Sequence, residues 1–260
     1  MSMPLFSRYI GIDYSGAETP ERSLPGLRMQ QATPDKPPIQ VDPPPSPRKH
    51  WTRCGIAEWL LRELRDGPPT LVGIDHGFSF PAAYFEVHRL PRIWEAFLND
   101  FCEHWPTDDN LYVDFVREGR YGKAAARTGN TRWRRLTEVR SRAKSVFHFN
   151  VQGSVAKSTH AGLPWLRYLR RELGRELHFW PFDGWSPAPG CSVIAEVYPS
   201  LWSRSYPIEG RTPDQHDAYS IARWMRETDA TGNLPQYFNP QLAPQDHATA
   251  CYEGWILGLQ

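Results

Sequence analysis

Two short stretches of the chain are apolar without alternation, and each stops on an aspartate. They are Arg8–Asp13 (RYIGID) and Thr70–Asp75 (TLVGID). Continuous apolar runs of this length are typical of central strands that are covered on both faces of a sheet. We therefore predict two buried strands, both of which end on the tripeptide Gly-Ile-Asp.

The residues between these strands predict a hairpin and a helix. Ile56, Leu60 and Leu64 recur at helical spacing, and Thr52 is a suitable N-cap, so we expect a helix over about 55–65. A strand, a helix and a strand in succession form a crossover, which makes the two aspartate strands parallel. Short strands are expected at 27–32 and 39–41. The intervening prolines exclude a sheet interior, which leaves an edge hairpin or a mobile flap.

The remaining pattern predicts an α/β protein with a mixed central sheet flanked by helices. We expect a single domain over residues 1–260, with a helical and basic insertion at about 80–145. The predicted elements are helices opened by Pro81 and Pro91 and at 108–117, a strand at 146–151, a helix at 161–173, strands at 176–182 and 191–197, a helix at 214–227 and a helical tail from 247.

Composition excludes several other classes of protein. Hydrophobic residues make up 40% of the 260 positions, which is too many for a disordered chain, and the formal net charge is +1. The four cysteines lie far apart, so neither a zinc site nor a disulfide framework is indicated. No apolar run approaches the roughly 18 residues that span a bilayer. We expect a cytoplasmic protein without a membrane partner, and its oligomeric state stays open.

Acidic residues occupy positions that suggest a metal site. Asp13, Asp75 and Glu196 come at or near the ends of predicted strands, and Asp214 and Asp217 share one face of a late helix. The carboxyl ends of parallel strands meet at one edge of a sheet. Crowded carboxylates there repel one another, and Mg²⁺ or Mn²⁺, which prefers oxygen ligands, relieves that repulsion. The alternative for each residue is a turn or helix cap, above all for Asp214, which follows Pro213.

Residues 117–157 carry eleven positive charges against two negative ones, in a chain that is otherwise near neutrality. Lys and Arg neutralise phosphates, and interleaved aromatic rings offer bases a stacking surface. The alternative is an ordinary solvated helix face. The candidate nucleic-acid-binding residues are Arg132, Arg134, Arg135, Arg140, Arg142, Lys144, Lys157 and Ser158.

The order of these motifs resembles the ribonuclease-H-like superfamily, and more narrowly a family of predicted ribonuclease-H-like nucleases. The resemblance rests on Gly11-Ile12-Asp13, Gly73-Ile74-Asp75, Glu196-Val197-Tyr198-Pro199, Asp214-Gln215-His216-Asp217-Ala218 and Glu253-Gly254-Trp255-Ile256. It implies a first strand beside and parallel to the fourth, with Asp13 next to Asp75. It also implies that Asp13, Asp75 and Asp217 are catalytic metal ligands, that Asp214 is a further metal ligand and that Glu196 is a fourth catalytic acid.

The leading hypothesis is thus a nuclease that uses Mg²⁺ or Mn²⁺ to hydrolyse phosphodiester bonds, with DNA or RNA undecided. Asp13-Tyr14-Ser15-Gly16 is also similar to the phosphate loop of the actin and sugar-kinase fold, so an ATP-dependent phosphotransferase is an alternative. A third hypothesis is a non-catalytic nucleic-acid-binding protein with the same fold. The segment before Lys157-Ser158 lacks the first glycine of a nucleotide-binding P-loop.

Overall fold

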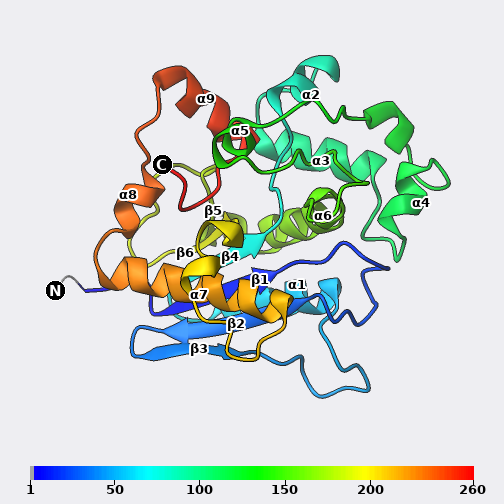
Figure 1. Ribbon diagram of the computed structural model, residues 1–260. Helices are drawn as coiled ribbons and strands as arrows, with labels where there is room; N and C mark the ends of the chain where they lie inside the picture. The colour runs from blue at the N-terminus through cyan, green and yellow to red at the C-terminus, as the bar shows by residue number, and fades with distance from the viewer. Residues whose placement is uncertain (1–2) are drawn as a thin grey trace.

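The apolar strands assemble into one six-stranded sheet in the order β3-β2-β1-β4-β6-β5 (Figure 1). The computed structural model describes residues 3–260. β1, β2 and β3 are antiparallel neighbours, whereas β1, β4, β6 and β5 run parallel to one another. The strands are β1 (Arg8–Asp13), β2 (Arg28–Thr33), β3 (Lys36–Gln40), β4 (Thr70–Asp75), β5 (Leu177–Trp180) and β6 (Ser192–Glu196).

The parallel pairing of the two aspartate strands confirms the sequence prediction. Gly11 lies opposite Gly73 and Asp13 opposite Asp75 in the register of β1 and β4. β3 is the edge strand, which confirms the edge-hairpin alternative and explains how Pro37 is tolerated in a strand.

Each face of the sheet has its own apolar core. Tyr9 and Leu71 pack with residues of α7 (Pro213–Ala230), including Ile221 and Met225. The alternate positions, such as Ile10, pack on the opposite face with α1 (Arg53–Arg65) and α6 (Ala156–Leu173). Figure 1 shows α7 crossing one face of the sheet, with α1 and α6 on the other side. The sheet is therefore the middle layer of three.

A helical block joins β4 to α6, as the sequence predicts, and further helices follow α7. The block has an aromatic interior in which Phe80 contacts Phe97, Phe101 and Phe147. These helices are α2 (Ala82–Val87), α3 (Trp94–His104), α4 (Val113–Arg117), α5 (Leu136–Ser141), α8 (Leu234–Phe238) and α9 (Pro244–Glu253).

Two expectations for this region are wrong in detail. The helix expected over 108–117 is shorter, because only Val113–Arg117 is helical. The strand expected at 146–151 is a series of turns. The Ser145 hydroxyl accepts the amide of Phe147 at 3.2 Å, and the Ser145 carbonyl accepts that of His148 at 3.0 Å. These local bonds compete with sheet pairing and close the chain into a turn.

Among residues 3–260, no helix combines the length and the apolar character needed to cross a bilayer.

Candidate functional site

Asp13 and Asp75 lie side by side at the carboxyl ends of β1 and β4. Neighbouring strands are about 4.8 Å apart, and side chains at alternate positions share one face. Because Tyr9 and Leu71 face α7, the same alternation directs both aspartates toward the α7 side of the sheet. Both residues are partly exposed. The register thus brings together two of the predicted metal ligands.

Asp214 and Asp217 lie in the first turns of α7, which covers this face. The helix has a capping box, in which Thr212 accepts the amide of Gln215 and the side chain of Gln215 accepts that of Thr212. Gly11 allows close contact, since a Cβ there would lie 2.2 Å from the carbonyl oxygen of Ala218. Because Gly11 has no side chain, the amino-terminal part of α7 packs directly against β1, the strand that ends at Asp13.

The aspartates interact electrostatically as one group. Burial raises the pKa of Asp13 well above its usual value, and repulsion by Asp75, Asp214 and Asp217 raises it further, while Arg28 opposes the rise. Burial and the charge of Asp217 likewise raise the pKa of Asp75.

Asp217 belongs to the same electrostatic group. Burial and Asp214 raise the pKa of the Asp217 carboxyl, and His216 and Ser203 oppose that rise. Acids that are buried together in this way favour either protonation or a bound cation.

The donor atoms suit Mg²⁺ or Mn²⁺, since carboxylate oxygens are the ligands that these ions prefer. Within the described residues, however, no three His, Cys, Asp or Glu side chains lie close enough to hold one ion. The adjacent pair of Asp13 and Asp75 is therefore the centre of the candidate site, and Asp214 and Asp217 flank it from α7.

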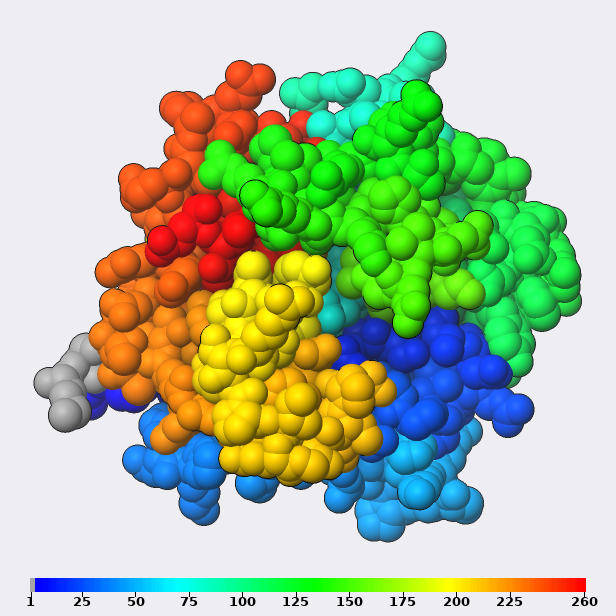
Figure 2. Space-filling model, viewed as in Figure 1, coloured from blue at the N-terminus to red at the C-terminus, as the bar shows by residue number. Residues whose placement is uncertain are grey.

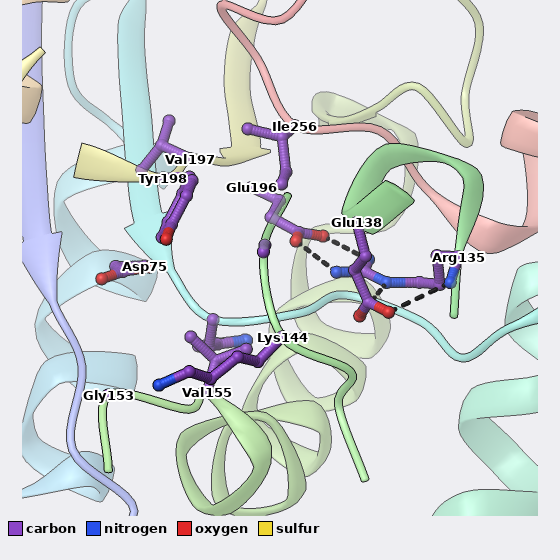
Figure 3. Close-up of a pocket in the computed structure, with 12 residues that line it drawn as sticks. Asp75, Arg135, Glu138, Lys144, Gly153, Val155, Glu196, Val197, Tyr198 and Ile256 are labelled. Atoms are coloured by element: carbon purple, nitrogen blue, oxygen red, sulfur yellow. Dashed lines mark hydrogen bonds and ion pairs between the residues drawn. The ribbon is translucent and has the colours of Figure 1, made fainter. Parts of the chain in front are cut away.

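Glu196 ends β6, and its carboxylate points toward Arg135 and away from Asp75 (Figure 3). Its two oxygens accept hydrogen bonds from the Arg135 guanidinium at 2.6 and 2.7 Å, and one also accepts the amide of Phe78 at 3.0 Å. A carboxylate engaged in this way has little capacity left for a metal. The role of Glu196 as a fourth acid stays a prediction, and the observed geometry favours a structural contribution.

Arg135 is the centre of a buried ionic cluster. Its side chain is 1% exposed and also pairs with Glu138 at 3.0 Å. Glu253 joins the same region, because its carboxylate accepts the amides of Leu136 at 2.8 Å and Ala82 at 2.5 Å. The cluster connects α5, β6 and the end of α9. Arg135 is thus a structural residue, and the expectation that it contacts nucleic acid does not agree with its burial.

A small cavity lies between Asp75 and this cluster (Figure 3). Its volume of about 20 Å³ exceeds the roughly 10–15 Å³ that one water molecule needs. Lys144 and Tyr198 line it together with Asp75, and Lys144 donates to the carbonyl of Gln152. Arg135 and Lys144 of the basic run thus line a cavity with a candidate metal ligand, and of these two only Lys144 is exposed.

The other basic candidates divide into paired and free side chains. Arg140 pairs with Asp246, Lys157 pairs with Asp114, and Arg134 donates to backbone carbonyls. Arg132 and Arg142 are exposed and have no ion pair within residues 3–260. In Figure 2 the green segment with the basic residues borders a hollow, alongside the yellow segment after β6 and the dark blue segment after β1. This segment therefore borders the hollow, and through Lys144 it reaches the cavity beside Asp75.

Ser158 is buried in the first turn of α6, and its hydroxyl donates to the carbonyl of Val155 at 3.0 Å. A Cβ on Gly16 would lie 2.1 Å from the carbonyl carbon of Lys157, so the turn after β1 covers this part of the helix. Direct binding of a phosphate by Ser158 is not favoured in this arrangement.

The sequence interpretation missed Arg28, the cross-strand partner of Asp13. The sequence predicts a hairpin that begins near residue 27. Which of its side chains lies beside Asp13 depends on the register between β2 and β1, and the hydrophobic pattern does not give that register. Arg135 was assigned to the surface because its neighbours in the sequence are basic, whereas its partner Glu196 is 61 residues away.

Comparisons of the chain with protein-family models, with curated proteins and with solved structures found no match.

Proposed function

We propose that this protein is a divalent-metal-dependent nuclease with a ribonuclease-H-like arrangement of strands. The observation that carries the proposal is the register that sets Asp13 beside Asp75 on adjacent parallel strands, under the helix that bears Asp217. An antiparallel β1-β2-β3 meander with β4 parallel to β1 is the order that the sequence resemblance implies, and this supports the assignment.

Mg²⁺ or Mn²⁺, when bound, would activate water and stabilise the charge that develops on a phosphodiester. Asp13 and Asp75 would hold the ion, and Asp217 and Asp214 would flank it from α7. The close approach of α7 at Gly11 keeps these acids on one face. The pKa of each of Asp13, Asp75 and Asp217 is raised by burial and by the neighbouring acids, so an added cation stabilises the ionised forms.

Arg132, Arg142 and Lys144 are the candidate contacts to the nucleic-acid backbone. All three are exposed. They would contribute a salt-dependent attraction for phosphates that does not depend on the base sequence. Both DNA and RNA are candidate substrates, because a phosphodiester backbone is common to them.

The test is cleavage of end-labelled single-stranded and double-stranded DNA, RNA and RNA–DNA hybrids in Mn²⁺ and in EDTA. Wild-type protein should cleave at least one substrate in Mn²⁺ alone. Asp75→Asn should lower the rate more than about 100-fold, since loss of a residue that only orients a metal ligand already costs 10- to 100-fold. Asp246→Asn, at a partly exposed ion pair with Arg140, is the control and should retain activity.

Absence of cleavage by the wild-type protein across the whole panel would contradict the nuclease proposal. If the protein also binds a nucleic acid, and this binding persists in Asp13→Asn and Asp75→Asn, the non-catalytic hypothesis is favoured instead.

A further inference from the structure

A second cavity lies beside the aspartate site, between the β2–β3 hairpin and the segment that follows it. Its volume is about 150 Å³, and its lining includes Arg28, Gln40, Lys49, His50 and Trp51. One water molecule needs roughly 10–15 Å³, so the cavity has room for a group much larger than water.

The walls of this cavity are fixed by hydrogen bonds. The backbone amide of His50 donates to the Ser23 hydroxyl at 2.8 Å, and that hydroxyl donates to the carbonyl of His50 at 2.9 Å. The indole of Trp51 donates to the carbonyl of Val41 at 2.8 Å. These bonds hold the segment that carries Lys49 and His50 to Ser23 and, through Trp51, to Val41. The walls of the cavity are therefore fixed by the protein itself.

The basic side chains of the cavity have no protein partner. Throughout residues 3–260, no hydrogen bond or ion pair engages the side chain of Arg28, Lys49 or His50, and Nε of Arg28 is buried without an acceptor. The carboxylate of Asp42, which also lines the cavity, accepts a hydrogen bond from Gln40 at 2.5 Å. A buried guanidinium nitrogen without an acceptor is costly, and an anion would remove that cost.

Arg28 connects the cavity to the aspartates. It pairs across the sheet with Asp13 and opposes the rise in the pKa of that carboxyl. Burial lowers the pKa of His50, and the charge of Arg28 lowers it further. Gln40, on the cavity wall, accepts a hydrogen bond at 2.7 Å from Gln215, the neighbour of Asp214 on α7. An anion in the cavity would therefore lie next to the candidate metal ligands.

We propose that this cavity binds a phosphate group of the substrate adjacent to the one that is cleaved, through Arg28, Lys49 and His50. The assignment of that phosphate to a nucleic acid rests on the proposed nuclease function. The site would hold the backbone on the β2 side of Asp13, whereas Lys144 of the basic segment lies at the cavity beside Asp75.

The first experiment titrates the wild-type protein with inorganic phosphate and follows backbone amide resonances by NMR. The amides of Lys49, His50 and Trp51 should shift and saturate. Lys49→Gln should weaken the binding about threefold or more, as expected for loss of one charged contact. His50→Gln should also weaken it, through loss of the hydrogen-bond donor of the imidazole ring. Lys36→Gln is the matched control, because Lys36 is exposed on β3 of the same hairpin and lies outside the cavity.

The second experiment measures cleavage by the same variants. Lys49→Gln should raise KM with little change in kcat, and it should reduce the salt dependence of oligonucleotide binding by about one counterion. Arg28 is left unchanged, because it is the cross-strand neighbour of Asp13 and its loss would confuse binding with catalysis.

The two proposals fail in different ways. Phosphate shifts in the cavity without any cleavage would support the anion site and contradict the nuclease function. Cleavage with an unchanged KM in Lys49→Gln, together with no amide shifts in phosphate, would overturn the anion site and leave the nuclease function standing.

Discussion

Asp13 and Asp75 combine two properties that single acids at strand ends do not have. They are direct neighbours in the sheet, and the pKa of each carboxyl is raised by burial and by the charge of nearby acids. Such an arrangement lowers the stability of the protein without metal. Acids of this kind are retained where function requires them, as expected from the trade-off between stability and activity.

We predict that Asp75→Asn stabilises the metal-free protein, because it removes a repulsive carboxylate next to Asp13. A gain of about 1 kcal/mol would raise Tm by about 2–4 °C for a chain of this size. The measurement is thermal unfolding in EDTA, with exposed Asp109→Asn as the control. Repeating it in Mn²⁺ should raise Tm of the wild-type protein and leave Asp75→Asn unchanged. A lower Tm for Asp75→Asn in EDTA would contradict the repulsion.

His160 gives a prediction about pH. Burial lowers its pKa to about 3, its Nδ1 bonds the carbonyl of Ala156 at 2.8 Å, and Nε2 is buried without a partner. Below pH 6.5 the unfolded chain binds a proton at this residue, whereas the folded protein does not until about pH 3. The free energy of unfolding should therefore fall as the pH drops from 6.5 toward 3, by up to about 1.4 kcal/mol per pH unit.

Urea unfolding at a series of pH values tests this contribution. His160→Phe should have a flatter profile than the wild-type protein between pH 6.5 and 4. His88→Gln, at a partly buried histidine of the helical block, should retain the wild-type slope. Equal slopes for His160→Phe and the wild-type protein would show that His160 is not the group responsible.

At the scale of elements, the structure depends on a few contacts between segments that are distant in the sequence. Arg135, in the turn before α5, forms an ion pair with Glu196 at the end of β6. Gly11 of β1 has no side chain, which allows α7 to pack closely against the strand. The first contact is electrostatic and the second is steric. Substitution of Arg135 should therefore act by leaving buried charges unpaired, and substitution of Gly11 by overpacking.

We expect Arg135→Met to destabilise the protein by about 3–5 kcal/mol, because it leaves Glu138 and Glu196 buried without a cation. Adding Glu196→Gln should restore part of the loss, since one of the two charges is then removed. Chemical denaturation of both variants provides the measurement, and exposed Arg132→Met should change stability little. A loss of less than about 1 kcal/mol for Arg135→Met would contradict the buried cluster.

Gly11→Ala should cost about 1–3 kcal/mol through overpacking, since the added Cβ would lie 2.2 Å from the backbone oxygen of Ala218. The displaced α7 should also carry Asp217 away from Asp13, so Mn²⁺ affinity should fall together with stability. Gly184→Ala is a useful comparison. Its glycine has positive φ, and a Cβ there would meet no atom within 4 Å, so only backbone strain is expected.

At this scale the sequence predicts most of the sheet. The unalternated apolar runs of β1 and β4 and the prolines of β3 are local signals with a physical cause, and the parallel pairing follows from the crossover. For residues 146–151 the hydrophobic pattern predicts a strand, whereas the structure has turns. The cause is that Ser145 accepts hydrogen bonds from nearby amides, and the hydrophobic pattern alone does not reveal such bonds.

For the whole molecule, the site lies where the sheet, α7 and the basic segment meet. Asp13 and Asp75 were found from a repeated tripeptide, and α7 from its spacing and cap. Arg28 and the pairing of Arg135 with Glu196 were not predicted, because they depend on register and on contacts across 61 residues. The sequence thus predicts the acidic centre of the site but not the charges that surround it.

The most direct test of the account is the position of a bound metal ion. A crystal of the wild-type protein soaked in Mn²⁺ should have an anomalous peak between the carboxylates of Asp13 and Asp75, with Asp217 as the nearest acid from α7. The peak should be lost in Asp75→Asn. A structure with Mn²⁺ elsewhere, or with no ion between these two aspartates at saturating Mn²⁺, would contradict the metal site and the nuclease proposal that depends on it.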